Sequence, residues 1–308
     1  MNLGIKILAL AFPLVVLASL IEAIVIAKRS GVAAYDWRSA GVSLFDALVR
    51  NAMRLVPLPI MGAIFGWVWE HRVATVPLDS FWAFVLLFFG QEFCYYWYHR
   101  AAHRIRWFWA THAVHHSPNE LNLAAAYRLG WTGKFTGTLL FFTPLVWLGF
   151  DPGVVVATLA ANLLYQFWIH ATWIPKLGWL EYALNTPSAH RVHHASNLRY
   201  LDANYGGVLI IFDRLFGTYV AEADEEPCVY GWVKPIRSYN PLRIEFTQWL
   251  ALFRDVASAR SLREVVGYLF APPGWRPDGA GETTEALRAA AGMSEPPSRP
   301  DRPLAPTL

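Results

Sequence analysis

The stretch NTPSAHRVHH, residues 185–194, places three histidines within five positions of a chain that contains only ten. These three have the spacing i, i+3, i+4, so on a helix their imidazoles share one face. The stretch HAVHH, residues 112–116, repeats this spacing, and HRAAH, residues 99–103, has two histidines four positions apart. The sequence therefore predicts three helical faces that each carry a histidine group.

The composition favours a protein that meets lipid over much of its surface. Hydrophobic residues make up 55% of the 308 residues and charged residues 16%, whereas a soluble domain carries about 25% charged residues. The formal charge of +3 is small, and no basic stripe or nucleic-acid motif is present, so nucleic acid is not an expected partner. With two cysteines and no Cys-x-x-Cys, a disulfide framework or a thiolate metal site is not expected either.

Five apolar segments predict the fold class, an all-α, multi-span transmembrane helical bundle of about four to five spans. One of them contains two arginines and two prolines and is either a kinked span or partly interfacial. Two others are separated only by Asp151 and Pro152, which predicts a transmembrane hairpin. In chain order the segments are 3–27, 43–69 (the one with the prolines), 78–98, 135–150 and 153–173.

Basic residues give the bundle an orientation. They follow the first, third and fifth segments, and the positive-inside rule places these ends in the cytoplasm. The histidine groups fall at the same ends. We therefore expect an integral, multi-pass membrane protein with its N-terminus outside and a cytoplasmic, histidine-rich cap that binds two metal ions.

The number of clustered histidines is the reason to expect two metals. A structural zinc needs four ligands and a catalytic zinc three, so eight or nine imidazoles are too many for one zinc. Imidazole suits Fe, Cu, Zn and Ni, but a site beside apolar spans favours redox iron that activates O₂ against a C–H bond. The isolated His71 is not an expected ligand. The candidate ligands are His99, His103, His112, His115, His116, His170, His190, His193 and His194.

HRAAH, HAVHH and HRVHH resemble the three histidine boxes of the integral-membrane fatty acid hydroxylase/sterol desaturase superfamily. The longer stretches HAVHHSPNELNLAAAYR, QFWIHATWIPKLGWLEYALNTPSAHRVHH and NYGGVLIIFDRLFGTY resemble its alkylglycerol monooxygenase-like branch. The resemblance covers roughly residues 80–235 and departs at Ala189, where relatives are expected to have a further histidine. It implies eight box histidines as iron ligands, with His170 as a ninth.

The resemblance also implies the reaction. It predicts a di-iron, O₂-dependent hydroxylase or monooxygenase that acts on an aliphatic C–H bond of a fatty acyl, alkyl-glycerol or sterol-like lipid. The chain has no GxGxxG or P-loop motif, so nucleotide cofactors are not expected to bind it. The electrons must come from an external donor, either a reduced pterin or an electron-transfer protein. The sequence makes no prediction of the oligomeric state.

Two alternatives stay open. A lipid or sterol desaturase would use the same di-iron centre and remove two hydrogens instead of adding oxygen. A histidine-lined metal transporter belongs to a different class of protein, and it predicts histidines spread through the depth of the membrane. The histidines of this chain cluster at one end of the apolar segments.

Three further polar residues are candidates for the catalytic site. Polar groups that hydrogen-bond to metal-ligating histidines orient their imidazoles. Glu92 lies seven residues before His99, on the same face of the predicted helix. Asp202 and Asn204 flank the third histidine group.

We predict four regions along the chain. The third is amphipathic, so its helices either lie on the membrane surface or pack on the protein's own cap. The fourth is rich in Pro, Gly, Ala, Ser and charge and is expected to be disordered. The regions are N-terminal transmembrane helices (1–76), the fatty acid hydroxylase/sterol desaturase catalytic domain (77–235), the amphipathic helices (236–270) and the tail (271–308).

Overall fold

The computed structural model describes residues 3–53, 56 and 58–293 of the chain. Within these residues the fold is all-α, as predicted. The described part contains no strand, and its only β-type pairings are the isolated bridges Leu184–Leu209 and Ala195–Tyr230.

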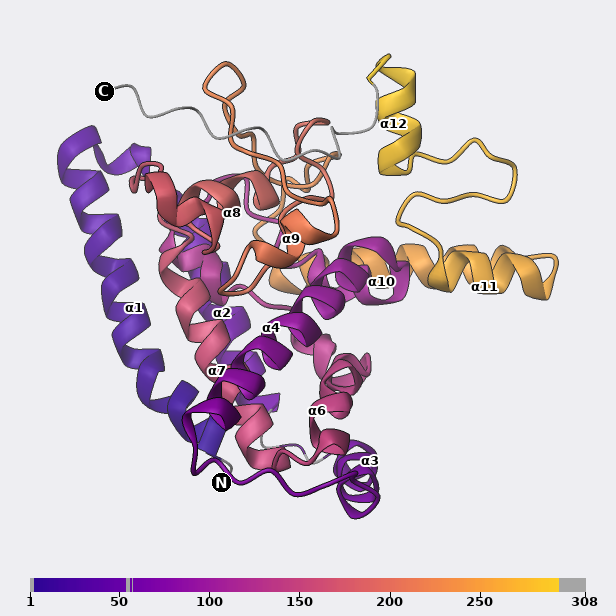
Figure 1. Cartoon of the computed structure of the whole chain (residues 1–308). Helices are drawn as coiled ribbons and strands as arrows, with labels where there is room; N and C mark the ends of the chain where they lie inside the picture. The colour runs from indigo at the N-terminus through magenta and orange to yellow at the C-terminus, as the bar shows by residue number, and fades with distance from the viewer. Residues whose placement is uncertain (1–2, 54–55, 57, 294–308) are drawn as a thin grey trace.

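Four long helices form the bundle below the histidine-bearing end (Figure 1). α1 and α4 both pack on α7. The four helices are α1 (Leu3–Ser30), α2 (Trp37–Met53), α4 (Phe81–Arg104) and α7 (Pro152–Trp168).

Shorter elements connect and cap the long helices. They are η1 (Val32–Ala34), α3 (Pro59–Glu70), α5 (Arg106–His112), η2 (Leu123–Tyr127), η3 (Trp131–Phe135), η4 (Thr138–Phe142), α6 (Thr143–Leu148), η5 (Gly178–Tyr182), α8 (Pro187–His194), α9 (Ile211–Leu215), α10 (Pro241–Ser258), α11 (Leu262–Phe270) and α12 (Thr284–Ala290).

Side-chain caps fix the start of two histidine-bearing helices. The hydroxyl of Ser80 accepts a hydrogen bond from the Ala83 amide at the start of α4. The hydroxyl of Thr186 does the same for the Ala189 amide in α8, where Pro187 occupies the first turn. Both caps satisfy amide groups that a helix leaves without an internal partner. The predicted helical face at 112–116 is only partly helical, because α5 ends at His112 and the chain continues in turns through 116.

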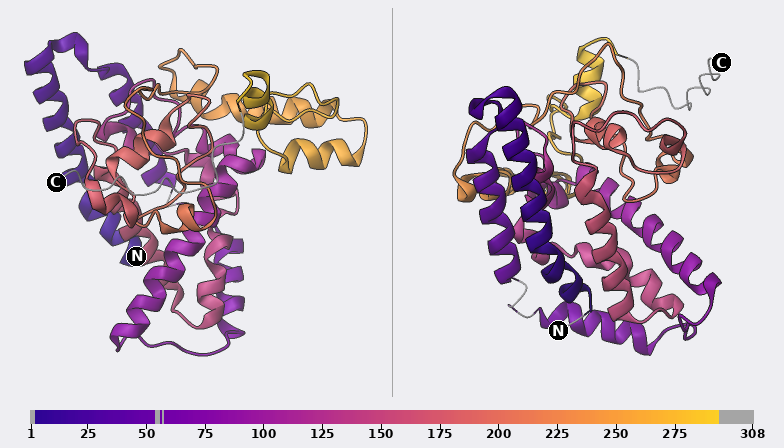
Figure 2. Two further views of the ribbon diagram at one scale, coloured as in Figure 1. Left: turned by 45° about the horizontal axis from the view of Figure 1, so that its top comes forward. Right: turned by 90° about the vertical axis from the view of Figure 1, so that its left-hand side faces the viewer.

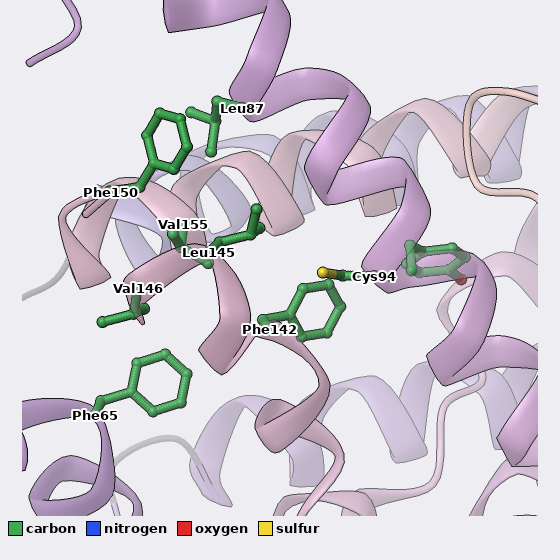
Figure 3. Close-up of a cluster of buried hydrophobic side chains, with 9 residues drawn as sticks. Phe65, Leu87, Cys94, Phe142, Leu145, Val146, Phe150 and Val155 are labelled. Atoms are coloured by element: carbon green, nitrogen blue, oxygen red, sulfur yellow. The ribbon is translucent and has the colours of Figure 1, made fainter. Parts of the chain in front are cut away.

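An apolar core joins α3, α4, α6 and α7 (Figure 3). Leu87 and Cys94 of α4 contribute to it, as do Phe142 and Val155, and all four are buried. The Cys94 thiol is therefore packed as an apolar group and is not paired in a disulfide. This core holds the lower part of the bundle together, and the polar, histidine-rich part of the chain lies above it.

One helix of the described residues, Lys6–Ser30 within α1, is long and apolar enough to cross a membrane by itself. Only 17% of its most apolar window is buried inside the protein. Leu10, Leu14 and Leu17 are examples of its exposed side chains. A surface of this kind is stable against lipid rather than water.

The structure corrects the predicted hairpin arm at 135–150. This segment is not one helix but the end of η3, then η4 and the short α6. Gly137 adopts a left-handed conformation with φ 82°, and Pro144 lies in the first turn of α6, where it lacks the amide that would continue a helix from η4. Hydropathy alone does not detect such breaks.

The predicted segment 43–69 is also divided. α2 ends at Met53 and α3 begins at Pro59. α3 lies across the lower end of the bundle rather than along it (Figure 2). The predicted segment is therefore two helices that run in different directions.

The tail was expected to be disordered from residue 271, but the structure differs for residues 271–293, which include α12. Arg288 of α12 is buried and donates hydrogen bonds to the carbonyls of Leu198 and Leu201. Composition does not reveal these contacts, because they join the tail to a distant loop. Residues 294–308 lie outside the described part of the chain.

Candidate metal centre

The nine candidate histidines meet above the bundle, around α8 and the upper ends of α4 and α7 (Figure 1). All are buried, with exposed fractions between 0% and 8%. They form two groups, and within each group the potential ligand atoms lie within 4.8 Å of one another. His71 lies outside both groups. Group A is His99, His103, His112, His116 and His193, and group B is His115, His170, His190 and His194.

The Nε2 atoms converge within each group. In group A, Nε2 of His112 lies 3.0 Å from Nε2 of His99 and 3.2 Å from Nε2 of His116. In group B, Nε2 of His190 lies 3.2 Å from that of His170 and 3.1 Å from that of His194. The imidazoles thus point their ring edges at two common centres rather than packing side by side as ordinary core residues.

The opposite ring nitrogens fix the tautomers. Nδ1 of His115 faces the Arg128 carbonyl at 3.1 Å, and Nδ1 of His170 faces the Gln166 carbonyl at 2.7 Å. A carbonyl oxygen only accepts, so Nδ1 must carry the proton and donate, and Nε2 of the neutral ring then has a lone pair. The two lone-pair nitrogens face each other at 3.4 Å with no proton between them.

A cation held by both nitrogens removes this repulsion, and buried groups without a partner support the same interpretation. Nε2 of His103 and Nε2 of His193 are buried and have no hydrogen-bond partner in the described residues. Leaving a buried polar atom unsatisfied costs about 1–3 kcal/mol. The residues therefore fit two metal ions, one for each group, with neutral imidazoles as ligands.

Burial also keeps four of these imidazoles uncharged. It lowers the pKa of His112, His116, His190 and His193 well below the ordinary value, and the neighbouring imidazoles lower it further. A neutral imidazole has the lone pair that a metal ligand requires. The cluster is therefore ready to bind metal at neutral pH.

A single loop orients three of the five group A histidines. Nδ1 of His99 donates to the Tyr205 carbonyl and Nδ1 of His193 to the Ala203 carbonyl, both at 2.9 Å. Nδ1 of His103 lies 3.4 Å from a carboxylate oxygen of Asp202. We call residues 202–206 the orienting loop. Partners of this kind set the tautomer and the ring direction of a metal ligand.

Asp202 contacts the candidate ligand His103 directly. Its other oxygen accepts hydrogen bonds from Arg104 at 2.8 Å and Thr284 at 2.7 Å. Burial opposes the charge of Asp202, but the contacts with His103, Arg104 and Thr284 lower its pKa to about 2. The carboxylate is therefore ionised at neutral pH.

Asn204 contacts no histidine. Its side chain donates to the carbonyls of Ala189 and Val220 and accepts from the Val220 amide. Its backbone is left-handed, with φ 58°, a conformation that asparagine tolerates better than most residues. Asn204 thus shapes the orienting loop and ties it to α8.

Glu92 also lies away from the imidazoles. One carboxylate oxygen accepts from the Asn162 amide at 2.5 Å, and the other from the amides of Val208 and Leu209 at 2.7 and 2.9 Å. Asn162 in turn accepts a hydrogen bond from Gln166 at 2.6 Å, whose carbonyl holds His170. Glu92 therefore anchors the chain just after the orienting loop and supports α7.

Several contributors to the site had no signal that sequence reasoning used. Asp213 accepts hydrogen bonds from the amides of Tyr205 and Gly206 and from the Thr218 hydroxyl. Burial raises its pKa to about 6. Arg128, which holds His115 through its carbonyl, is itself buried against Ser39. The available signal was a charged residue inside a mainly apolar stretch that resembles the family. Asp213 lies in such a stretch, NYGGVLIIFDRLFGTY, and Arg128 in another, HAVHHSPNELNLAAAYR.

Gly206 leads to a direct test of the orienting loop. A Cβ at this position would lie 2.2 Å from the Leu209 carbonyl oxygen, a backbone atom that cannot move aside by itself. Gly206→Ala should therefore lower the stability by about 1–3 kcal/mol and loosen His99. Gly62→Ala, on α3 where no atom lies within 4 Å, is the matched control. Thermal unfolding of both variants checks the prediction, and equal melting temperatures would contradict it.

A cavity of about 240 Å³ opens onto the histidines. His103, His116 and His193 of group A and His194 of group B line it, together with Trp109 and Trp232. We call it the chamber. A smaller cavity of about 90 Å³, with mostly apolar walls from α1, α2 and α7, has none of the nine histidines in its lining. A reacting molecule would thus reach the candidate metals through the chamber.

Comparison with known proteins agrees with this geometry. The Fatty acid hydroxylase family model matches residues 84–218, which include all nine histidines. Human alkylglycerol monooxygenase is 41% identical over 212 residues, covering 68% of this chain and 47% of the human protein. The alkylglycerol monooxygenase of Xenopus tropicalis is 38% identical over 240 residues, covering 78% and 52%.

A bacterial protein, the ornithine lipid hydroxylase OlsE of Rhizobium tropici, is 29% identical over 197 residues, covering 59% of each chain. No solved structure matches. The chain spans about half the length of the alkylglycerol monooxygenases that it matches. Residues 84–218 therefore match the fatty acid hydroxylase family, and the chain is similar to the alkylglycerol monooxygenase-like branch of that family.

Proposed function

We propose that the protein is a membrane-bound oxidoreductase that uses iron and O₂ to hydroxylate an aliphatic C–H bond of a lipid. The observation that carries the proposal is the pair of buried histidine groups, in which lone-pair nitrogens face each other. The match to the fatty acid hydroxylase family and relatives named as monooxygenases and a lipid hydroxylase support it.

Two iron ions would be held by the five histidines of group A and the four of group B. Iron bound in this way supplies the activation of O₂ and the oxidising power needed to break an unactivated C–H bond. The protein's part is to fix the ligands and to shape the space beside them. Backbone carbonyls of Ala203, Tyr205 and Arg128 hold the Nδ1 protons, so each Nε2 stays free for the metal.

The chamber would bring one C–H bond of the substrate to the metals and limit the access of water. Trp109 lies against His103 and His116, with ring centroids 5.4 and 5.7 Å apart. Trp232 is buried and donates to the Ala113 carbonyl at 2.6 Å, which fixes the turn that carries His115 and His116. Two rigid indole rings suit a wall that contacts an aliphatic chain.

Hydroxylation consumes one C–H bond, O₂, two electrons and two protons, and it gives an alcohol and water. The chain has no nucleotide-binding motif of its own, so we propose that the electrons come from an external donor. A reduced pterin and an electron-transfer protein are the two candidates. The mouth of the chamber, which includes Lys234 and Glu282, offers a polar approach for either.

We propose that the protein crosses the membrane several times. α1, α2, α4 and α7 are the long helices of the bundle. The irregular segment 135–150 leads the chain from the histidine-bearing end, which α4 reaches, back to the opposite end, where α7 begins (Figure 1). The histidine-bearing end would face the cytoplasm, because basic residues such as Lys28 and Arg104 lie in the last turns of α1 and α4, at that end.

The helices α10 and α11 have the exposed apolar side chains that a helix on the membrane surface requires. Leu250 and Phe253 of α10 and Leu262 and Phe270 of α11 are exposed apolar side chains on helices that also carry charges. Such helices bind at the interface of a bilayer. We propose residues 1–76 as N-terminal membrane helices, 77–235 as the catalytic domain and 236–270 as this surface region.

A desaturase would use the same residues and differ in its product. The relatives are named for hydroxylation or monooxygenation, and they include putative methylsterol monooxygenases of Dictyostelium discoideum. We therefore favour hydroxylation of a fatty acyl, alkyl-glycerol or sterol-like lipid. A metal transporter is disfavoured, because the nine buried histidines gather in two compact groups at one end of the fold and do not follow its length.

The reaction is tested by isotope labelling. Cells that express the protein should, under ¹⁸O₂, form a lipid that contains one ¹⁸O atom and is absent from cells without the gene. Mass spectrometry of the total lipid extract detects it, and a lipid with two fewer hydrogens and no label would indicate desaturation instead. If the lipids of the two cell lines are identical and the purified protein contains no iron, the proposal is wrong.

A further inference from the structure

The segment that follows α11 crosses the mouth of the chamber and forms one of its walls. Pro273, Gly274, Glu282, Thr284 and Leu287 line the cavity that the group A histidines also line. We call residues 272–291 the C-terminal strap. It includes α12, which stands beside the loops that surround α8 (Figure 1).

Four polar side chains of the strap, Glu282, Thr284, Glu285 and Arg288, hold it against the rest of the fold. Glu282 pairs with Lys234, and Glu285 pairs with Arg104. Arg288 donates to the carbonyls of Leu198 and Leu201 at 2.9 and 2.7 Å. The exposed ion pairs contribute little by themselves, whereas the buried Arg288 anchors α12 firmly.

The fourth contact reaches a candidate metal ligand. The Thr284 hydroxyl donates to Oδ2 of Asp202 at 2.7 Å, and Oδ1 of the same carboxylate lies 3.4 Å from Nδ1 of His103. Three side chains thus lie in sequence, from Thr284 of the strap through Asp202 to the imidazole of His103. Arg104 shares Oδ2 with Thr284.

His103 differs in this respect from its neighbours. Nδ1 of His99 and of His193 faces a backbone carbonyl, which the fold of the orienting loop holds in place. His103 instead depends on a side chain, and a side chain rotates more freely than the backbone. Its direction is therefore set by whatever fixes the carboxylate of Asp202.

We propose that the C-terminal strap positions His103 through Thr284 and Asp202, so that closing the chamber and orienting a metal ligand are one event. Thr284 is a positioning residue, since it lines the chamber but acts on the metal site through Asp202. When the strap is docked, both carboxylate oxygens are engaged and His103 points at group A. When it leaves, the chamber opens and Asp202 loses one of its three partners. The proposal rests on the proposed metal site.

The test uses Thr284→Val, which keeps the shape of the side chain and removes its hydroxyl. The full-length protein is loaded with ferrous iron, and the release of iron to an excess of a chelator is followed under anaerobic conditions. Loss of a group behind a metal ligand typically lowers metal affinity about 10–100-fold. We expect iron release from Thr284→Val to be at least about tenfold faster than from the wild type.

Three further variants make the result specific. Thr284→Ser keeps the hydroxyl and should release iron at the wild-type rate. Thr284→Ala removes the hydroxyl with a residue that favours helices, so it gives the same readout if the valine variant is unstable. Arg199→Gln breaks the exposed pair with Glu225, which does not include Thr284, Asp202 or His103, and should leave the rate unchanged.

The outcomes separate this inference from the proposed function. Fast release from the valine and alanine variants, with wild-type rates for the serine and Arg199 variants, supports the strap. If the wild-type protein holds iron, and Thr284→Val and Thr284→Ala both release it at the wild-type rate, the inference is overturned and the proposed function stays intact. A wild-type protein that holds no iron overturns both.

Discussion

Replacement of His193 by alanine is expected to remove iron from the protein and to abolish lipid oxidation. His193 lies at the centre of group A, with its ring centroid 4.3 Å from that of His99 and 4.7 Å from that of His103. Its Nε2 is buried without a hydrogen-bond partner in the described residues. Changing a group behind a metal ligand costs about 10–100-fold, and removing a ligand itself should cost more. We expect less than about 1% of the wild-type activity.

The control for this prediction is His71→Ala. His71 is exposed and stacks on Trp67, far from both groups in the fold. Its loss should change neither iron content nor activity. The iron content of each purified variant, measured by elemental analysis, checks the prediction. A His193→Ala protein that keeps the iron content of the wild type would contradict the ligand assignment.

Replacement of Glu92 by alanine is expected to destabilise the whole catalytic region. Three donors, from the buried Asn162 and Leu209 and the half-buried Val208, would lose their acceptor at once. Each unsatisfied donor costs about 1–3 kcal/mol, so the loss is comparable with the total stability of about 5–15 kcal/mol that a domain has. We expect a large fall in melting temperature together with loss of iron.

Two controls show whether Glu92 acts through structure. Glu92→Gln keeps an acceptor oxygen and should fall between the wild type and the alanine variant. Glu70→Ala changes an exposed carboxylate at the end of α3 and should have no effect on melting. If Glu92→Ala melts at the wild-type temperature and keeps its iron but is inactive, Glu92 takes part in the chemistry and the anchoring role is wrong.

The histidine groups could be predicted because helical spacing is a local property. HRVHH forms α8 with all three histidines in the cluster, and HRAAH lies at the end of α4. His115 and His116 reach the cluster from turns instead. Which histidines belong to which group depends on how distant segments meet. Group B, for example, joins His115, His170 and α8, and spacing carries no information on that.

The groups that orient the ligands were harder to predict. Asp202 was found because a carboxylate beside a histidine group is a visible signal, and it lies next to His103. The carbonyls of Ala203, Tyr205 and Arg128 carry no such signal, because every residue has a carbonyl. Glu92 shares a helix face with His99, but seven residues of helix separate them by about 10 Å along the axis, so the carboxylate contacts other partners.

The apolar segments show the limit of hydropathy. The segments that became α1, α4 and α7 were found close to their bounds, because each long apolar run stays helical even where it contains a proline (Pro13 of α1) or a glycine (Gly90 of α4). The segment 135–150 was not, because Gly137 and Pro144 divide it. The order of residues 271–293 was also missed, since it comes from ion pairs and from the buried Arg288 rather than from an apolar pattern.

The most direct test of the central claim is to count the metal ions. The full-length protein, purified from iron-replete cells in mild detergent, is analysed for iron, zinc, copper and nickel against protein concentration from amino-acid analysis. We predict two metal ions per chain, since five histidines of group A and four of group B are available. We predict that both ions are iron, with little of the other metals, because the proposed reaction requires redox iron. A single metal ion per chain, or none, would contradict the two-metal centre.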